Sequence, residues 1–128
     1  MRGPKILIAD DDRSVRAALT KRLSAWGYRV LAVCDGLGVI AQVAREPVVA
    51  MILDHGMPNG QGQDVAYMIR RESDAPIIFL SGYGRETFQQ IAWALPDVFY
   101  LSKPVCIIHL QSLLLDLLGP CNIDRACA

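Results

Sequence analysis

The stretch VVAMILD, residues 48–54, decides the fold expected for this chain, because six apolar residues in a row end in one acid. Six residues suit a strand better than a helix, and an apolar run without alternation is typical of a parallel strand that is buried on both faces. We therefore expect residues 48–53 at the centre of a sheet, with Asp54 at the carboxyl end of that strand.

Four further strand-like runs surround this stretch, and segments with helical periodicity separate them. The runs are Lys5 to Ala9, Tyr28 to Val33, Ile77 to Leu80 and Val98 to Leu101. The helical segments are Val15 to Trp26, Gly36 to Arg45, Asp64 to Glu72, Phe88 to Leu95 and Leu110 to Leu118. Asp12 or Ser14 can cap the first of them, and Gly27 can end it. Because strands that alternate with helices form parallel sheets covered on both faces, we predict a doubly wound, five-stranded α/β domain.

Composition limits the classes of function. The chain has 128 residues, which is the size of one domain, and 52% of them are hydrophobic, enough for a sizeable core. Thirteen basic residues balance thirteen acidic ones, so no basic excess indicates contact with nucleic acid. The apolar runs are too short for a membrane span or a signal peptide, and the four cysteines lack metal-ligand spacing. We expect a cytoplasmic domain with reduced thiols that contacts neither nucleic acid nor membrane.

Polar residues stand at the ends of four predicted strands. The first strand ends in Asp10-Asp11-Asp12, the third in Asp54 and the fourth in Ser81, and the fifth runs on to Lys103. Ligands of parallel α/β sheets bind outside the carboxyl ends of the strands, so these side chains should converge there. Carboxylates at short range repel each other unless a cation holds them, and Mg²⁺ suits such oxygen ligands.

A hydroxyl and an ammonium on the other side of such a site match the oxygens of a phosphoryl group. The set therefore predicts a carboxylate that attacks phosphorus and becomes an acyl phosphate. Single residues have plainer explanations, since Asp12 can be only a helix cap, Ser81-Gly82 a turn and Lys103 a solvated loop residue. Their combination and their order along the chain carry the prediction.

The chain resembles the receiver domain of two-component response regulators, over residues 5 to about 118. The resemblance rests on five separated motifs in the family's order. They are Ile6 to Asp12, Leu53-Asp54, Met57-Pro58, Leu80-Ser81-Gly82, and the run from Tyr100 to Pro104. It implies the flavodoxin-like (βα)5 fold of CheY, for which the strand order is 2-1-3-4-5.

The resemblance also implies a role for each matching residue. Asp54 would be the phosphoacceptor, and Asp10, Asp11, Asp54 and the carbonyl of Gly56 would bind Mg²⁺. Ser81 and Lys103 would contact the phosphoryl group, and Tyr100 would be the aromatic switch that changes rotamer with Ser81. Pro104 is at a position where a cis bond often follows the lysine.

The function implied is phosphorelay signalling rather than turnover of a substrate. A sensor histidine kinase or a histidine phosphotransfer protein would supply the phosphoryl group. The fourth helix, fifth strand and fifth helix would then bind a downstream effector or an output domain absent from this chain, or form a homodimer. We expect residues 1–120 to be the receiver domain and residues 121–128 a short tail.

Two rival functions use the same residues. A haloacid-dehalogenase-like phosphatase would use Asp10 as nucleophile with Asp12, Ser81 and Lys103, but it leaves Asp54 unexplained and needs a further acidic motif. A receiver-like module that binds partners without phosphorylation is the second. We expect no catalytic role for His55, because side chains of adjacent extended residues such as Asp54 and His55 point to opposite faces, and none for His109 in the last predicted helix. Tyr83 is predicted to shield the acyl phosphate from water, which Tyr83→Ala would test through the lifetime of the phosphate.

Overall fold

The computed structural model describes residues 3–56, 62–82 and 95–119. They form one parallel sheet in the order β2-β1-β3-β4-β5. Its strands are β1 (Lys5–Ala9), β2 (Arg29–Val33), β3 (Ala50–Asp54), β4 (Ile77–Ser81) and β5 (Val98–Ser102). The helices described are α1 (Arg13–Ala25), α2 (Gly36–Arg45), α3 (Gly62–Arg70) and α5 (Ile107–Leu118). The predicted fold class and strand order are confirmed.

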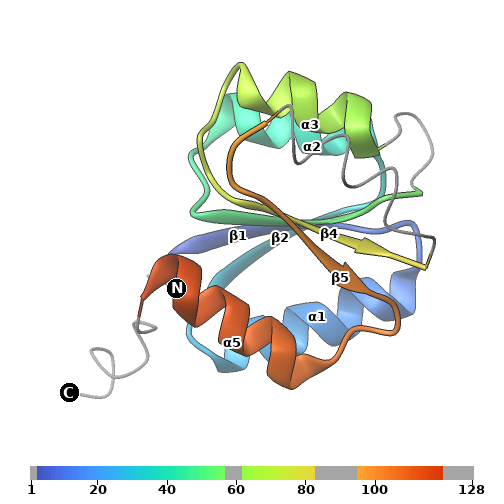
Figure 1. Ribbon diagram of the computed structural model, residues 1–128, viewed down its shortest axis with the longest axis vertical. Coiled ribbons are helices and arrows are strands. Elements are labelled where there is room, and N and C mark those ends of the chain that lie inside the picture. The colour runs from blue at the N-terminus through green and yellow to red at the C-terminus, as the bar shows by residue number, and fades with distance from the viewer. Residues whose placement is uncertain (1–2, 57–61, 83–94, 120–128) are drawn as a thin grey trace.

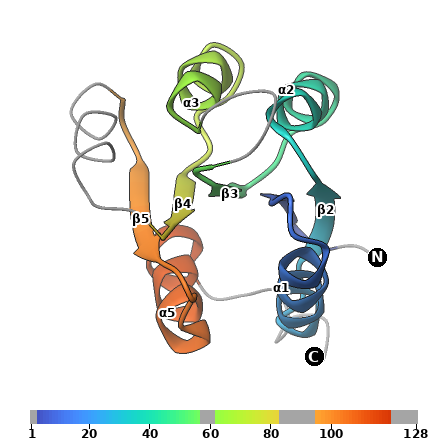
Figure 2. The same ribbon diagram turned by 90° about the vertical axis from the view of Figure 1, so that its right-hand side faces the viewer.

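The helices cover both faces of the sheet, with α2 and α3 on one side and α1 and α5 on the other (Figures 1 and 2). Alternation along the strands divides the core accordingly. Leu7, Leu53 and Phe79 belong to a buried cluster together with residues of α2 and α3. Ile8, Ile52 and Leu80 belong to a second cluster together with residues of α1 and α5. Each strand thus supplies both layers, as two-sided burial requires.

The central strand is β3, and all five of its residues are buried. It pairs with β1 on one side and β4 on the other. The strand begins at Ala50, two residues later than predicted, because Val48 and Val49 form the approach to it. The backbone N–H of Val49 still donates to the Lys5 carbonyl at 2.8 Å. The shift moves Asp54 from the residue after the strand to its last residue, in register with Leu80.

The ends of α1 follow local sequence signals. Asp12 is the N-cap, and its carboxylate accepts from the backbone N–H groups of Ser14 and Val15. Gly27 follows the helix with φ +97°, a left-handed conformation in which glycine avoids the strain of a Cβ atom. The predicted cap and stop are both confirmed.

Parts of the predicted organisation lie outside the described residues. These are the helix predicted to begin at Phe88, as far as residue 94, the Met57-Pro58 motif, Tyr83 and the tail at 121–128. In the described part of the chain, no helix combines the length and apolar character needed to cross a membrane.

Candidate functional site

The polar strand ends meet at one edge of the sheet. Asp10 directly follows β1 and Asp54 ends β3, and both side chains lie on the α1–α5 side, because they continue the alternation of Ile8 and Ile52. Ser81 ends β4, and Lys103 follows β5, where its backbone N–H donates to the Ser81 carbonyl at 2.9 Å. The structure therefore brings the side chains of Asp10, Asp54 and Lys103 together, and the backbone of Ser81 lies at the same edge.

Three carboxylates form a cluster at this edge. Asp10, Asp11 and Asp54 each place an oxygen within 4.8 Å of the others. Asp10 is 2% exposed and Asp54 8%, whereas Asp11 is open to solvent. Burying two anions side by side is unfavourable without a compensating cation. The cluster therefore has the donor set and the negative charge that a hard divalent cation requires.

Lys103 supplies a positive charge to the two buried acids. Its Nζ lies 3.0 Å from Asp10 Oδ2 and 3.2 Å from Asp54 Oδ1. Partial burial disfavours its ammonium, but hydrogen bonds and charge from Asp10 and Asp54 outweigh that effect and raise the pKa of Lys103 above its usual value. One ammonium facing three carboxylates leaves the cluster net negative.

The two buried aspartates differ in how their oxygens are used. Asp10 accepts at both, from the Asp12 N–H at Oδ1 (2.8 Å) and from Lys103 at Oδ2. Asp54 accepts from the Gly56 N–H (3.3 Å) and from Lys103, both at Oδ1. Within residues 3–56, 62–82 and 95–119, Asp54 Oδ2 receives no hydrogen bond. Among the described residues, Asp54 thus has one oxygen without a hydrogen-bond donor, whereas both oxygens of Asp10 have one.

Arg16 holds the acidic turn in place, a role that the sequence analysis did not assign. Its guanidinium donates to the Asp10 carbonyl at 2.7 Å. One signal could have indicated it: position 16 is one helical turn beyond the N-cap Asp12, so its side chain reaches back over the turn between β1 and α1. The contact fixes the backbone that carries Asp10 and Asp11.

Tyr100, the predicted switch residue, is on β5, the strand next to the one that Ser81 ends. Ser81 is buried, and the Tyr100 hydroxyl is 3.5 Å from the Ser81 carbonyl oxygen, a long contact. Tyr100 itself is half-buried. The Lys103-Pro104 peptide bond is cis, as the resemblance implied.

His55 points away from the reacting edge. Its ring packs edge-on against Phe79, with centroids 5.7 Å apart and planes at 76°. Phe79 belongs to the cluster on the α2–α3 side, so His55 and Asp54 lie on opposite faces, as expected. Burial lowers the pKa of His55, although the charge of Asp54 acts in the opposite direction. Its Nε2 is buried and has no hydrogen-bond partner in the part of the chain that the structure describes.

We expect His55 to make the fold sensitive to mild acid. Because its pKa is lower in the folded state, the unfolded chain binds the proton first, and stability falls as the pH drops below about 6.5. His55→Phe should keep the edge-on ring contact and reduce this loss between about pH 7 and pH 5, as measured by urea unfolding with EDTA. Replacement of the exposed His109 by Gln is the matched control. Equal acid sensitivity in wild type and His55→Phe would refute the prediction.

Comparison with known proteins supports the resemblance to receiver domains. Residues 6–115 match the response regulator receiver domain. The chain is 41% identical over 103 residues to the probable transcriptional regulator ycf27 of Galdieria sulphuraria, a match that covers 80% of this chain and 40% of that protein. Matches to two further curated relatives cover 48% and 52% of their lengths. The chain thus spans about half the length of the curated relatives it matches.

Two solved structures share the fold across nearly the whole chain. The receiver domain of the sensor histidine kinase PA1611 from Pseudomonas aeruginosa PAO1, with a magnesium ion coordinated in its active site cleft, is 26% identical with a TM-score of 0.81. The alignment covers 91% of this chain and 98% of that one. CheY4 of Vibrio cholerae is also 26% identical with a TM-score of 0.81, over 90% and 98% of the two chains. On the family match, the strand order and these likenesses, the chain belongs to the response regulator receiver domain family.

Proposed function

We propose that this receiver domain accepts a phosphoryl group on Asp54. The observation that carries the proposal is the difference between the two buried aspartates: Asp54 Oδ2 receives no hydrogen bond from the described residues, whereas both oxygens of Asp10 are engaged. A carboxylate that has a free oxygen, beside an ammonium able to bind a phosphoryl oxygen, has the arrangement of a nucleophile.

The residues around Asp54 would bind the phosphoryl group and hold Asp10 in position. Lys103, already 3.2 Å from Asp54 Oδ1, neutralises charge on the incoming phosphoryl group. The Ser81 hydroxyl, at the end of the neighbouring strand, donates to a second phosphoryl oxygen. Arg16 and the Asp12 N–H keep Asp10 in position throughout. No side chain needs to act as a base, because a carboxylate attacks phosphorus without losing a proton.

Mg²⁺ fits the acidic cluster. Asp10, Asp11 and Asp54 offer carboxylate oxygens at short range, which is the donor type that this ion prefers. The related receiver domain with magnesium in its cleft supports the assignment. These three side chains would hold the ion, with the Gly56 carbonyl as a further ligand, and the bound ion would neutralise charge on the phosphoryl oxygens.

Loss of one ligand should weaken magnesium binding. We expect Mg²⁺ to raise the unfolding temperature of wild type, because a ligand that binds only the folded state stabilises it. Asp10→Asn should need about tenfold more Mg²⁺ for the same rise. Asp116→Asn on α5, an exposed acid far along the sequence, is the matched control. A titration curve for Asp10→Asn that overlays wild type would exclude Asp10 as a ligand.

The phosphoryl group would then change the surface of the domain. It adds about −1.5 to −2 charges at the sheet edge, which draws Ser81 and Lys103 toward it and shifts a two-state equilibrium that includes Tyr100. A sensor histidine kinase or phosphotransfer protein would be the donor. A downstream effector, an output domain or a second copy would bind at the face of β5 and α5. Residues 1–120 would form the receiver unit, with residues 121–128 as a tail.

Intact mass measured after incubation with acetyl phosphate tests the proposal. With Mg²⁺ present, we expect the wild-type protein to gain one alkali-labile phosphoryl group, and EDTA should suppress the gain. A folded protein that gains no phosphoryl group under any of these conditions would instead be a receiver-like module that binds partners without phosphorylation.

A further inference from the structure

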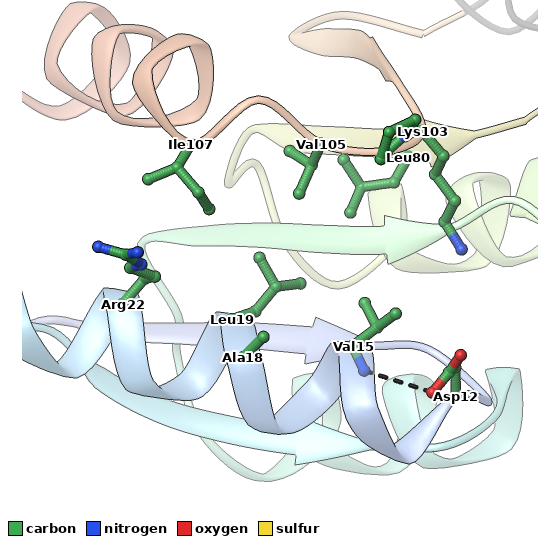
Figure 3. A pocket seen from close by; sticks show the side chains of 10 residues that line it. Asp12, Val15, Ala18, Leu19, Arg22, Leu80, Lys103, Val105 and Ile107 are labelled. Atoms are coloured by element: carbon green, nitrogen blue, oxygen red, sulfur yellow. Dashed lines mark hydrogen bonds between the residues drawn. The ribbon is translucent and has the colours of Figure 1, made fainter.

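A groove lies beside the proposed phosphoacceptor, between α1 and the chain that follows β5 (Figure 3). Its volume is about 660 Å³, within the range of small-molecule sites. Val15, Ala18 and Leu19 of α1 form one wall, and Val105 and Ile107 form the other. Both walls of the groove are therefore mainly apolar.

The groove is continuous with the acidic site. Lys103 lines it and also pairs with Asp10 and Asp54, so one ammonium belongs to both. Leu80, which lines it as well, is the register partner of Asp54 across β3 and β4. The side chains of Leu80 and Asp54 are both on the α1–α5 side of the sheet. A molecule in the groove would thus have one end next to the phosphoacceptor.

The charged residues of the groove stand at its two ends. Lys103 and Asp12 stand at one end and Arg22 at the other (Figure 3). The Asp12 carboxylate is already engaged, since it accepts the N–H groups of Ser14 and Val15. Lys103 is shared with Asp10 and Asp54, so its end of the groove would accept an anionic group once Mg²⁺ offsets the charge of the acidic cluster. The apolar walls between the two ends match the apolar body of such a ligand.

We propose that this groove binds the acyl group of small acyl phosphates, so that the domain discriminates among such phosphodonors in favour of those with a bulky apolar acyl group. The inference rests on the proposed function of Asp54. An Asp54 oxygen forms the new bond to phosphorus as the bond from phosphorus to the acyl carboxylate oxygen breaks. The electron pair leaves with that oxygen, the organic acid departs as its anion, and no proton moves.

Benzoyl phosphate and acetyl phosphate are the two donors to compare. Both release a carboxylate, but only the first carries a ring that can enter the groove and leave water. We expect half-maximal labelling of wild type at about tenfold lower benzoyl phosphate than acetyl phosphate, measured by intact mass with Mg²⁺ present.

The variant Ala18→Phe fills the groove from an exposed position on α1, where it should not impair folding. It should bring the ratio of the two half-maximal concentrations close to one. Ala17→Phe is the matched control, because Ala17 is also exposed on α1 but does not line the groove, and its ratio should equal that of wild type.

Binding without reaction gives a second measurement. Sodium benzoate added to the protein with Mg²⁺ present should shift the NMR signals of Val15, Ala18 and Val105, and Ala18→Phe should abolish the shifts. Equal half-maximal concentrations for both donors in wild type would overturn the inference, and so would benzoate shifts that occur only at other residues. Either result would leave Asp54 as the phosphoacceptor and make a partner's helix the expected occupant of the groove. Failure of both donors to label Asp54 would overturn the proposed function as well.

Discussion

Asp54→Asn is expected to abolish phosphorylation by acetyl phosphate. An amide is a far weaker nucleophile than a carboxylate and cannot form the acyl phosphate, while its size leaves the packing of β3 unchanged. Intact mass should show the added phosphoryl group on wild type and none on the variant under the same conditions.

The matched control is Asp116→Asn, at an exposed acid of α5 that belongs neither to the acidic cluster nor to the groove, so labelling should continue. An adduct that persists in Asp54→Asn and disappears in Asp10→Asn would contradict the account and indicate the phosphatase-like chemistry at Asp10.

Lys103→Met should have the largest effect on stability. It removes the ammonium that lies 3.0 Å from Asp10 and 3.2 Å from Asp54, and leaves two buried carboxylates without that partner. Because Lys103 is 30% exposed, we expect a loss of about 2 kcal/mol in the free energy of unfolding, less than for a fully buried pair. Urea unfolding at neutral pH with EDTA measures it.

Two conditions should reduce this difference between Lys103→Met and wild type. Mg²⁺ should stabilise the variant more than wild type, because it replaces the missing positive charge. Alkaline pH should also reduce the difference in stability, because the pKa of Lys103 is higher in the folded state than in the unfolded chain. The stabilisation from its ammonium is therefore complete below about pH 10.5 and is lost as the pH rises through the folded-state pKa. Lys21→Met, at an exposed lysine of α1, is the control. Equal stability of Lys103→Met and wild type in EDTA would show that the ion pairs contribute nothing.

Much of the fold could be predicted because its signals are local or periodic. The apolar run before Asp54 indicated a central strand, and Asp12 and Gly27 marked the ends of α1. The position of the polar strand ends at one sheet edge could also be predicted from the sequence, since the carboxyl ends of parallel strands lie at the same edge. The strand order itself came from the resemblance, because periodicity does not specify which strands are neighbours.

Contacts between distant segments could not be predicted. The difference between Asp10 and Asp54 depends on which oxygen Lys103 and the neighbouring N–H groups reach, and no sequence pattern encodes that choice. Arg70 at the end of α3 donates to the carbonyls of Pro96 and Asp97 before β5, a pairing set by tertiary packing. The groove beside α1 likewise exists only once α1 and the chain after β5 are placed together.

The position of the phosphoryl group distinguishes Asp54 from the other acids of the cluster. Borohydride reduction of the acyl phosphate marks the modified carboxyl group as an alcohol, and peptide mass mapping then identifies the residue. We predict that the mark is on Asp54 in wild-type protein labelled with acetyl phosphate and Mg²⁺. A mark on Asp10 or Asp11 instead would show that another acid accepts the phosphoryl group.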